Sequence, residues 1–360
     1  MQQSPNIRSS PMPGTFREDA TQNSDSISSR LESKKTPRVP WARLVVALAA
    51  AAMMMALIVL RFRPGGPLVL PNDYTLHWWA GDALRRGYSP YAVINAWSTQ
   101  YPFCSGYLYW LPTAFILEPF ARLPIQWAMV VFTGCSTGIF TYALTRDGWW
   151  RLPFLASLPF YHAAIGGQVV PLVVAAMLVP SLGWLAPMKY TMAAAGFAYN
   201  LSRRYVVLAA AVVVFSIVIA PWWPMQWWRE LSDVAGRYYH VPLLVPGGVL
   251  ALFALLRWRR PEARLLAVMT CLPQTMLFYD QLPLLLVAET RRQALAMTLT
   301  SWLPILAVAW AHGGAMAAER QTLFAWNAPV IVAMYYLPCA ALILFRKTRA
   351  TAKSASFETS

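Results

Sequence analysis

The hydrophobic residues of this chain lie in long blocks, and polar residues are largely confined to the stretches between them. Residues 41–60 are apolar apart from Arg43 and are long enough to cross a bilayer core of about 30 Å. Several later blocks are shorter and contain Pro or Gly, so we expect broken or re-entrant helices that face a protein or water cavity. These later blocks are residues 103–121, 125–144, 152–165, 168–185, 190–202, 205–220, 243–256, 264–279, 281–288, 296–311 and 324–345. The pattern predicts an all-α, polytopic transmembrane helical bundle over residues 40–346, with about 10–12 membrane segments.

The polar stretches predict two tails and one long loop. Residues 1–39 are rich in Ser, Thr, Pro, Gln and Asn and have almost no aliphatic content, which predicts a disordered cytoplasmic tail. Residues 347–360 predict a second cytoplasmic tail. Because basic residues precede the block at 41–60 and it lacks a small-residue cleavage site, we expect a retained signal anchor. Residues 61–102 then form a long first outer loop, and long loops usually carry function.

Composition and charge strengthen the membrane assignment. With 58% hydrophobic and 12% charged side chains, the chain has too little polar surface to cover a soluble globule of 360 residues. Its net charge of +15 is concentrated beside apolar blocks, at 34–43, 257–260 and 346–349, which is the positive-inside pattern and argues against nucleic acid as a partner. We therefore expect a multi-pass protein of the bacterial cytoplasmic (inner) membrane. Its N-terminus is expected in the cytoplasm, with residues 61–102 and 221–242 outside.

Motifs of soluble enzymes are absent from the sequence. It contains no GxxxxGK[ST], HExxH or GxSxG, and no GxGxxG between a strand and a helix. The four cysteines are scattered without metal-ligand spacing, so neither a metal site nor a disulfide framework is predicted, and no cofactor is expected. The segment GCSTG at 134–138 matches GxxxG, which in an apolar helix predicts a packing face.

The first outer loop contains two carboxylates and a histidine. Asp73 stands before an aromatic-rich run, where it can either cap a helix or act chemically. Asp82 lies nine positions later and points elsewhere if the stretch is helical, so we expect it to be solvated or paired with Arg85 or Arg86. His77, one helical turn beyond Asp73, is either an orienting partner of Asp73 or an interfacial histidine with satisfied hydrogen bonds.

The second outer segment, residues 221–242, contains cations among aromatic residues. Arg237 stands beside Tyr238, Tyr239 and His240, so it is either a binding residue or an interfacial one. Arg229 lies between Trp228 and Glu230, a position that favours an interfacial anchor.

Three segments taken in order resemble glycosyltransferase family 87, whose members use polyprenol-phosphate sugars and share the multi-spanning GT-C fold. The segments are NDYTLHWWAGDALRRGYSPY, YPFCSGYLYWLPTAFILEPFARLP and GGQVVPLVVAAMLVP, and the resemblance covers roughly residues 70–185. The matching positions are Asp73, the box from Gly87 to Tyr91, Tyr101-Pro102, Pro119, Pro124 and Gly167-Gln168. Beyond residue 190 only the hydropathy and the hairpin tip at Tyr279-Asp280 fit. The family's Lys-Pro pair is replaced by Pro187-Met188-Lys189, which makes Lys189 the corresponding cation.

The resemblance implies an integral-membrane glycosyltransferase that moves a mannose-like hexose from a polyprenyl phosphate to a lipid or glycan acceptor on the outer face. Asp73 would be the general base, because burial at an apolar interface can raise the pKa of a carboxylate towards the working range. Cations would hold the departing phosphate, with Arg favoured for its planar, bidentate geometry. The implied substrate-binding residues are Arg237, His240, Tyr239, Gln168, Lys189 and Tyr91, with Arg229 a further phosphate candidate. Gln168 and the nearby His162 are each either sugar contacts or structural residues.

Two other functions fit part of the pattern. A transporter or lipid flippase of cell-envelope precursors would also have broken helices and charges at membrane depth, but it would be expected to show internal repeats, and none is evident here. A catalytically inactive assembly subunit would keep the fold and lose the base, and the presence of Asp73 counts against that interpretation.

Overall fold

The computed structural model describes residues 41–62, 73–103, 105–311 and 328–346, without the side chains of 234–238, 308, 309 and 311. The chain divides into the units Met1–Ala42 and Arg43–Ser360, and the description below concerns the second unit. Within the described ranges every regular element is helical, and β structure is limited to two isolated bridges. This confirms the all-α class for that part of the chain. The two predicted tails, 1–39 and 347–360, lie outside the described residues.

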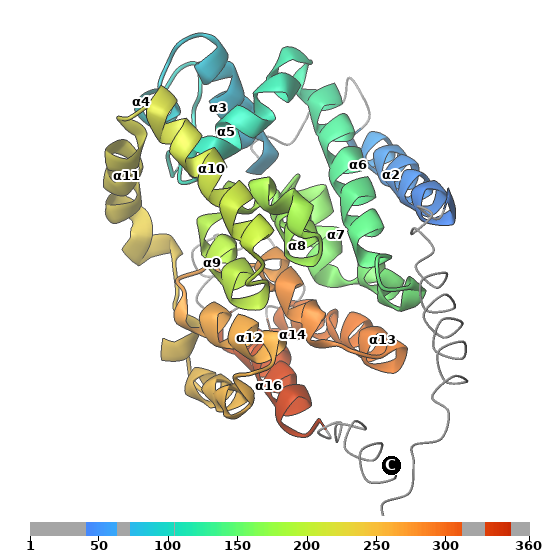
Figure 1. Ribbon diagram of the computed structural model, residues 1–360. Coiled ribbons are helices and arrows are strands. Elements are labelled where there is room, and N and C mark those ends of the chain that lie inside the picture. The colour runs from blue at the N-terminus through green and yellow to red at the C-terminus, as the bar shows by residue number, and fades with distance from the viewer. Residues whose placement is uncertain (1–40, 63–72, 104, 312–327, 347–360) are drawn as a thin grey trace, which may run out of the picture. The chain divides into compact units, whose positions relative to one another are not determined.

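The helices are many and mostly short (Figure 1). The α-helices are α2 (Trp41–Phe62), α3 (Asp73–Arg85), α4 (Pro90–Val93), α5 (Leu111–Leu117), α6 (Ile125–Leu144), α7 (Leu158–Ile165), α8 (Val170–Leu178), α9 (Tyr190–Tyr199), α10 (Arg203–Ile219), α11 (Trp223–Tyr238), α12 (Pro261–Cys271), α13 (Arg291–Thr300), α14 (Leu303–Ala311) and α16 (Leu337–Leu344). The 3-10 helices are η1 (Glu118–Arg122), η2 (Trp149–Ala156), η3 (Pro180–Met188), η4 (Pro242–Leu244), η5 (Gly248–Arg257) and η6 (Phe278–Val287), and η7 (Val332–Tyr336) is a π-helical turn.

Two helices of the described residues, α2 and α6, are long and apolar enough to cross a membrane. A third candidate is the pair α10 and α11, if the two count as one span bent by 102°. Shorter apolar helices occur at Gly248–Arg257, Phe278–Val287 and Ala328–Leu344. Two of the predicted apolar blocks are divided between short helices, residues 152–165 between η2 and α7 and residues 168–185 between α8 and η3, which confirms that these blocks are broken. That they face a protein or water cavity stays a prediction. The larger number of membrane segments expected from hydropathy stays a prediction.

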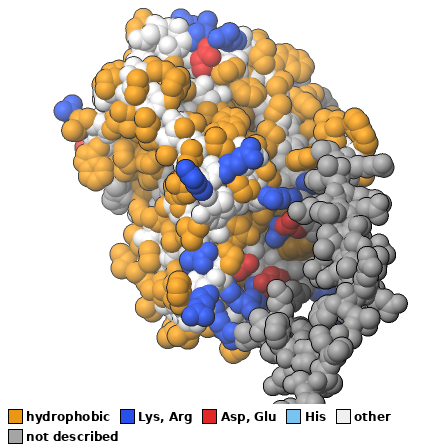
Figure 2. Space-filling model, in the orientation of Figure 1, with side chains coloured by type: hydrophobic (Ala, Val, Ile, Leu, Met, Phe, Trp, Pro, Cys, Tyr) orange, Lys and Arg blue, Asp and Glu red, His pale blue; other side chains and the backbone are white. Residues whose placement is uncertain are grey.

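Apolar side chains on the candidate spans face outward. On α10, Val214, Phe215 and Val218 are 59%, 62% and 74% exposed, and α2 exposes Val45 and Leu48 in the same way. Hydrophobic side chains cover much of the face in Figure 2, and Lys and Arg form separate groups at its top, in its middle and in its lower part. A soluble protein rarely exposes such large apolar patches, so these faces are suited to lipid.

The helices α2 and α6 pack closely because α6 has glycines on the facing side (Figure 1). A Cβ atom on Gly134 would lie 2.4 Å from Cγ of Met55, and one on Gly138 would lie 3.3 Å from Cβ of Ala51. A larger residue at either position would force α2 or its side chains to shift, which confirms the prediction that GCSTG is a packing face.

The bend between α10 and α11 follows from two prolines. Pro221 follows Ala220, the C-cap of α10, and Pro224 is the second residue of α11. Neither proline can donate the backbone hydrogen bond that a continuous helix would need. The new direction carries α11 over α4 and the segment before α5, where Nε1 of Trp227 donates to the carbonyl of Leu108 at 3.0 Å.

Two groups of buried residues form the interior of this unit. The larger group includes residues of α6, α7, α8, α9, α12, η6 and α16. The smaller group contains residues of α3, α4, the segment 101–115 and the α10–α11 junction. Tyr109 packs against both groups, and the polar cluster described next lies beside it.

Candidate functional site

Asp73 is the first residue of α3 and is half-buried. Its Oδ2 atom accepts hydrogen bonds from Nε2 of Gln168 and, at 3.2 Å, from the hydroxyl of Tyr279. Gln168 lies in the turn between α7 and α8, and Tyr279 lies in η6. Three segments that are distant in the sequence therefore converge on one carboxylate, and the described contacts of Asp73 go beyond the helix capping that its position alone would explain.

Gly167 places Gln168 against α3. Its φ angle is +61°, in the left-handed region, where a side chain is disfavoured. A Cβ atom there would lie 2.5 Å from Cβ of Tyr74, the residue after Asp73. The Gly-Gln pair therefore has a physical reason: the glycine lets the turn approach α3, and the following glutamine, which is 1% exposed, reaches the carboxylate.

Lys189 and Asp280 form an ion pair next to Asp73. The Lys189 ammonium lies 2.5 Å from Oδ1 of Asp280, and Thr275 donates a hydrogen bond to Oδ2 of the same carboxylate. The ammonium also lies 4.6 Å from the centre of the Tyr279 ring, whose hydroxyl contacts Asp73. The two side chains are 11% and 1% exposed, so a buried cation and two carboxylates share this site.

Two histidines lie close to this cluster without hydrogen-bonding to Asp73. The ring of His77 meets that of Tyr109 edge-on, 4.4 Å between centres, and neither ring nitrogen has a hydrogen-bond partner among the described residues. Burial, with the charge of Lys189 as a smaller cause, lowers the pKa of His77 to about 3, so its imidazole is neutral. The expectation of an interfacial histidine with satisfied hydrogen bonds is therefore wrong. The ring of His162 packs against Tyr279, 5.4 Å between centres.

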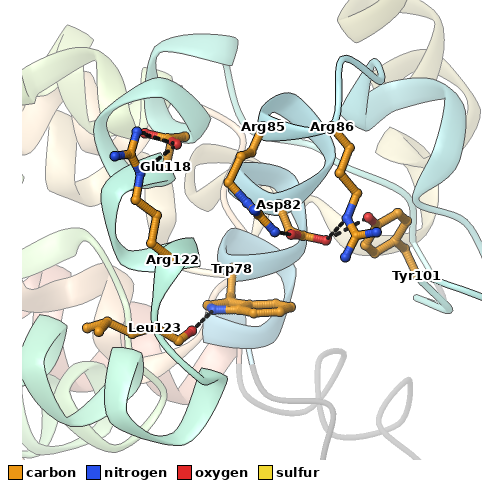
Figure 3. A network of polar contacts seen from close by, with 8 residues as sticks. All are labelled: Trp78, Asp82, Arg85, Arg86, Tyr101, Glu118, Arg122 and Leu123. Atoms are coloured by element: carbon orange, nitrogen blue, oxygen red, sulfur yellow. Dashed lines mark hydrogen bonds and ion pairs between the residues drawn. The ribbon is translucent and has the colours of Figure 1, made fainter.

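Asp82 belongs to a separate network, which Figure 3 shows. Its carboxylate accepts from Arg85 at 2.6 Å, from Arg86 at 2.8 Å and from the hydroxyl of Tyr101 at 2.8 Å. Burial acts to raise the pKa of Asp82, but the three donors together outweigh it and hold that pKa below its usual range. The predicted pairing with Arg85 or Arg86 is confirmed with both. The alternative of a solvated carboxylate is wrong, because Asp82 is only 2% exposed.

The same part of the molecule contains two further side-chain links. In Figure 3, Arg122 pairs with Glu118 at 3.1 Å, and Nε1 of Trp78 donates to the carbonyl of Leu123 at 3.0 Å. The first link lies within η1, and the second attaches the residue after η1 to α3.

Tyr91 supports the cluster from outside. Its hydroxyl donates to the backbone carbonyl of Tyr109 at 2.8 Å, and its ring is 4% exposed. Tyr239 lies nearer to the site: burial raises the pKa of its hydroxyl well above the usual value, and the neighbouring Tyr190, Tyr109 and Asp280 raise it further. His240 contributes through its backbone, which pairs with Gln274 at 2.8 and 2.9 Å and so holds the segment that leads to Thr275.

The two arginines proposed for phosphate binding have different outcomes. Arg229 is exposed on α11, as expected of an interfacial anchor. The side chain of Arg237 lies outside the described part of the chain. Among the described residues, Lys189 is the predicted phosphate-binding cation that lies beside Asp73.

Sequence reasoning missed the site residues that have no motif of their own. Tyr109 donates from its hydroxyl to Oε1 of Gln168 at 3.3 Å, and Thr275 contacts Asp280. In the sequence, Tyr279 and Asp280 indicate only a hairpin tip. One signal was available for Tyr109: the alternation in YLYW before a helix places Tyr107 and Tyr109 on the same side of an extended segment.

The cluster can perform proton transfer and hold an anion. A carboxylate with two hydrogen-bond donors is kept in one orientation, and an ammonium next to it can neutralise a second negative charge. No three His, Cys, Asp or Glu side chains of the described residues come together as a metal site would require. Comparison of the chain with protein-family models, curated proteins and solved structures found no match.

Proposed function

We propose that this chain is an integral-membrane glycosyltransferase of the GT-C fold. It transfers a mannose-like hexose from a polyprenyl-phosphate sugar to a lipid or glycan acceptor on the outer face of a bacterial cytoplasmic membrane. One observation carries the proposal: Asp73, Gln168 and Lys189 belong to one polar cluster, connected through Tyr279. These are the three positions that the resemblance to glycosyltransferase family 87 singles out as base, sugar contact and cation.

The proposed reaction needs one base. The acceptor hydroxyl attacks the anomeric carbon while Asp73 removes its proton. A bond forms between the acceptor oxygen and the anomeric carbon, and the bond from that carbon to the phosphate oxygen breaks. The electron pair leaves with the polyprenyl phosphate. An ionised carboxylate accepts hydrogen bonds only, so the donors Gln168 and Tyr279 suit the form that a base requires.

Lys189 supplies positive charge for the departing phosphate. An ammonium group has three donors, and among the described residues Asp280 accepts from one of them, which leaves two for phosphate oxygens. The carboxylate of Asp280 is anchored by Thr275 and keeps Lys189 in place beside the Tyr279 ring. Stabilising charge that develops in a buried site is commonly the largest single contribution to catalysis.

The variant Asp73→Asn tests the base. The two described donors of Asp73 contact the same oxygen, so asparagine can keep these two hydrogen bonds through its amide oxygen while it cannot accept a proton. Turnover of a polyprenyl-phosphate mannose donor by protein in lipid nanodiscs should fall roughly a hundredfold or more, with little change in melting temperature. The matched control is Asp147→Asn, because that carboxylate is 58% exposed and pairs only with Arg151 in the described structure. A fully active Asp73→Asn enzyme would overturn the proposed role.

A transporter or flippase is the second candidate, and one observation favours it. Buried ion pairs such as Lys189–Asp280 also line substrate and ion pathways in membrane transporters. The two functions differ in their product. Vesicles that contain the purified protein and a labelled polyprenyl-phosphate sugar should accumulate a glycosylated acceptor if the chain is a transferase. Movement of unchanged donor between the leaflets, without new product, would favour the transporter.

A further inference from the structure

Tyr109 makes no described hydrogen bond to Asp73, yet its hydroxyl lies 3.3 Å from Oε1 of Gln168, whose Nε2 donates to Asp73. We propose that Tyr109 is a positioning residue that fixes the direction of the Gln168 amide and thereby the orientation of the Asp73 carboxylate. This inference rests on the proposed function, in which Asp73 is the base.

The polarity of the three groups allows one arrangement. An ionised carboxylate accepts hydrogen bonds and cannot donate, so the NH2 end of the Gln168 amide must face Asp73. The Oε1 atom then points away from Asp73 and needs a donor of its own, because Gln168 is only 1% exposed. The hydroxyl of Tyr109 is that donor.

Loss of the Tyr109 hydroxyl removes the second anchor of the Gln168 amide. The ionised carboxylate still favours the NH2 end, but Oε1 would be left buried without a donor, which is costly. The amide can then turn away from Asp73 to bring Oε1 to another donor, and this weakens one of the two described hydrogen bonds that orient the carboxylate. A hydroxyl that never touches the substrate can therefore control the geometry of the base.

Tyr109 is itself held in place from several directions. Its backbone carbonyl accepts from the hydroxyl of Tyr91 at 2.8 Å, its ring meets His77 edge-on, and the Tyr107 ring lies 6.0 Å from its centre. The box from Gly87 to Tyr91 thus reaches the site through Tyr109. Tyr91, expected to bind substrate, is assigned here to the support of Tyr109.

A double-mutant cycle tests the inference. The variants are Tyr109→Phe, Gln168→Met and the double variant. The control is Tyr107→Phe, because Tyr107 is a buried tyrosine on the same segment and has no described contact with Gln168. Tyr109→Phe should lower kcat about tenfold with KM changed less than about twofold, because the base is misplaced while binding is kept. The double variant should be no slower than Gln168→Met alone, since Tyr109 acts through the amide. Tyr107→Phe should stay within about twofold of wild type.

Two results would overturn the inference: a Tyr109→Phe enzyme with unchanged kcat, or a double variant in which the two losses multiply. The latter would mean that Tyr109 acts on the fold independently of Gln168. The outcome is separable from that of the proposed function. A fully active Asp73→Asn enzyme would contradict the role of Asp73 as the base. An inactive Asp73→Asn enzyme, together with losses that multiply in the double variant, would contradict only the role of Tyr109.

A measurement without turnover gives a second test. The infrared carboxylate band of Asp73 is isolated as the difference between wild type and Asp73→Asn. It should shift in Tyr109→Phe and in Gln168→Met and stay in place in Tyr107→Phe. An unchanged band in Tyr109→Phe would show that the Asp73 carboxylate does not sense the tyrosine, and the inference would fail.

Discussion

The ammonium of Lys189 lies 2.5 Å from Oδ1 of Asp280, and this pair joins the start of α9 to η6 in an environment that excludes most solvent. Breaking a buried ion pair by removing one partner typically costs about 3–5 kcal/mol, because the other charge is left without compensation. We expect Asp280→Ala to destabilise the protein by about this amount and to lower its melting temperature in detergent.

The double variant Lys189→Met, Asp280→Leu separates stability from activity. Apolar residues of similar volume often replace a buried ion pair without loss of stability, so its melting temperature should recover towards wild type. Transfer should stay low, because the cation for the phosphate is gone. Full activity in the stable double variant would contradict the role of Lys189.

The contribution of Asp82 to stability should depend on pH. Because its pKa is lowered in the folded protein, the stabilisation by its ionised form is complete above the unfolded pKa of about 3.9 and is lost as pH falls through the folded value. The melting temperature of Asp82→Asn should therefore be below that of wild type by a constant amount between about pH 5 and 8, and the difference should shrink below about pH 4. Transfer activity per folded molecule should change much less than in Asp73→Asn.

Glu118→Gln is the control for Asp82→Asn. Arg122, the partner of Glu118, is 69% exposed, and such surface pairs contribute about 0–1 kcal/mol to stability. A melting-temperature difference for Asp82→Asn that persists undiminished to pH 3 would show that the charge of Asp82 is not its source.

Substitution of Gly167 should disturb both the backbone and the approach to α3. Gly167→Ala places a Cβ atom on a residue with a φ of +61°, 2.5 Å from Cβ of Tyr74. We expect the free energy of unfolding to fall by about 1–3 kcal/mol. Transfer activity should also fall, because Gln168 is displaced. Gly87→Ala is the matched variant, because Gly87 has a φ of +80° but no atom within 4 Å of the added Cβ. Gly87→Ala should lose only the stability that a positive φ costs an alanine, about 1–2 kcal/mol. Equal melting temperatures and equal activities would argue against the close approach.

The glycines of α6 should be needed for contact with α2. Gly134→Val would bring its side chain against Met55, whose Cγ lies 2.4 Å from the position of a Cβ, and overpacking of this kind typically costs about 1–3 kcal/mol. Met55→Ala in the same chain should restore much of the lost stability by making room. If Met55→Ala instead adds its own loss to that of Gly134→Val, the two residues do not share this contact.

The basic segments should face the cytoplasm together. Glu289 pairs with Arg260 at 3.3 Å and with Arg346 at 2.6 Å, so three segments distant in the sequence lie at one end of the unit. The positive-inside rule predicts that this end is cytoplasmic. Reporter fusions near residue 90 and at residue 350 should give opposite signals. Equal signals would contradict the predicted topology.

Several features were predictable because they depend on neighbours along the chain. Hydropathy placed a helix at 125–144, where α6 lies, because a helix in lipid satisfies its own backbone and needs only a run of apolar residues. The spacing of Asp82 and Arg86 within one helical turn predicted their ion pair. The GxxxG spacing predicted a close packing face without indicating that α2 would occupy it.

The composition of the site was decided by tertiary structure. Asp73 and Lys189 were singled out in the sequence, but that both adjoin Tyr279 depends on how α3, α9 and η6 pack. Asp280 and Tyr109 have no motif, and each acquires a role only through a partner far along the chain. Local patterns record helical period and hydropathy, which act between near neighbours. Hydrogen bonds and ion pairs between distant residues form when packing buries polar groups together. Because these groups have lost contact with water, they must pair with one another.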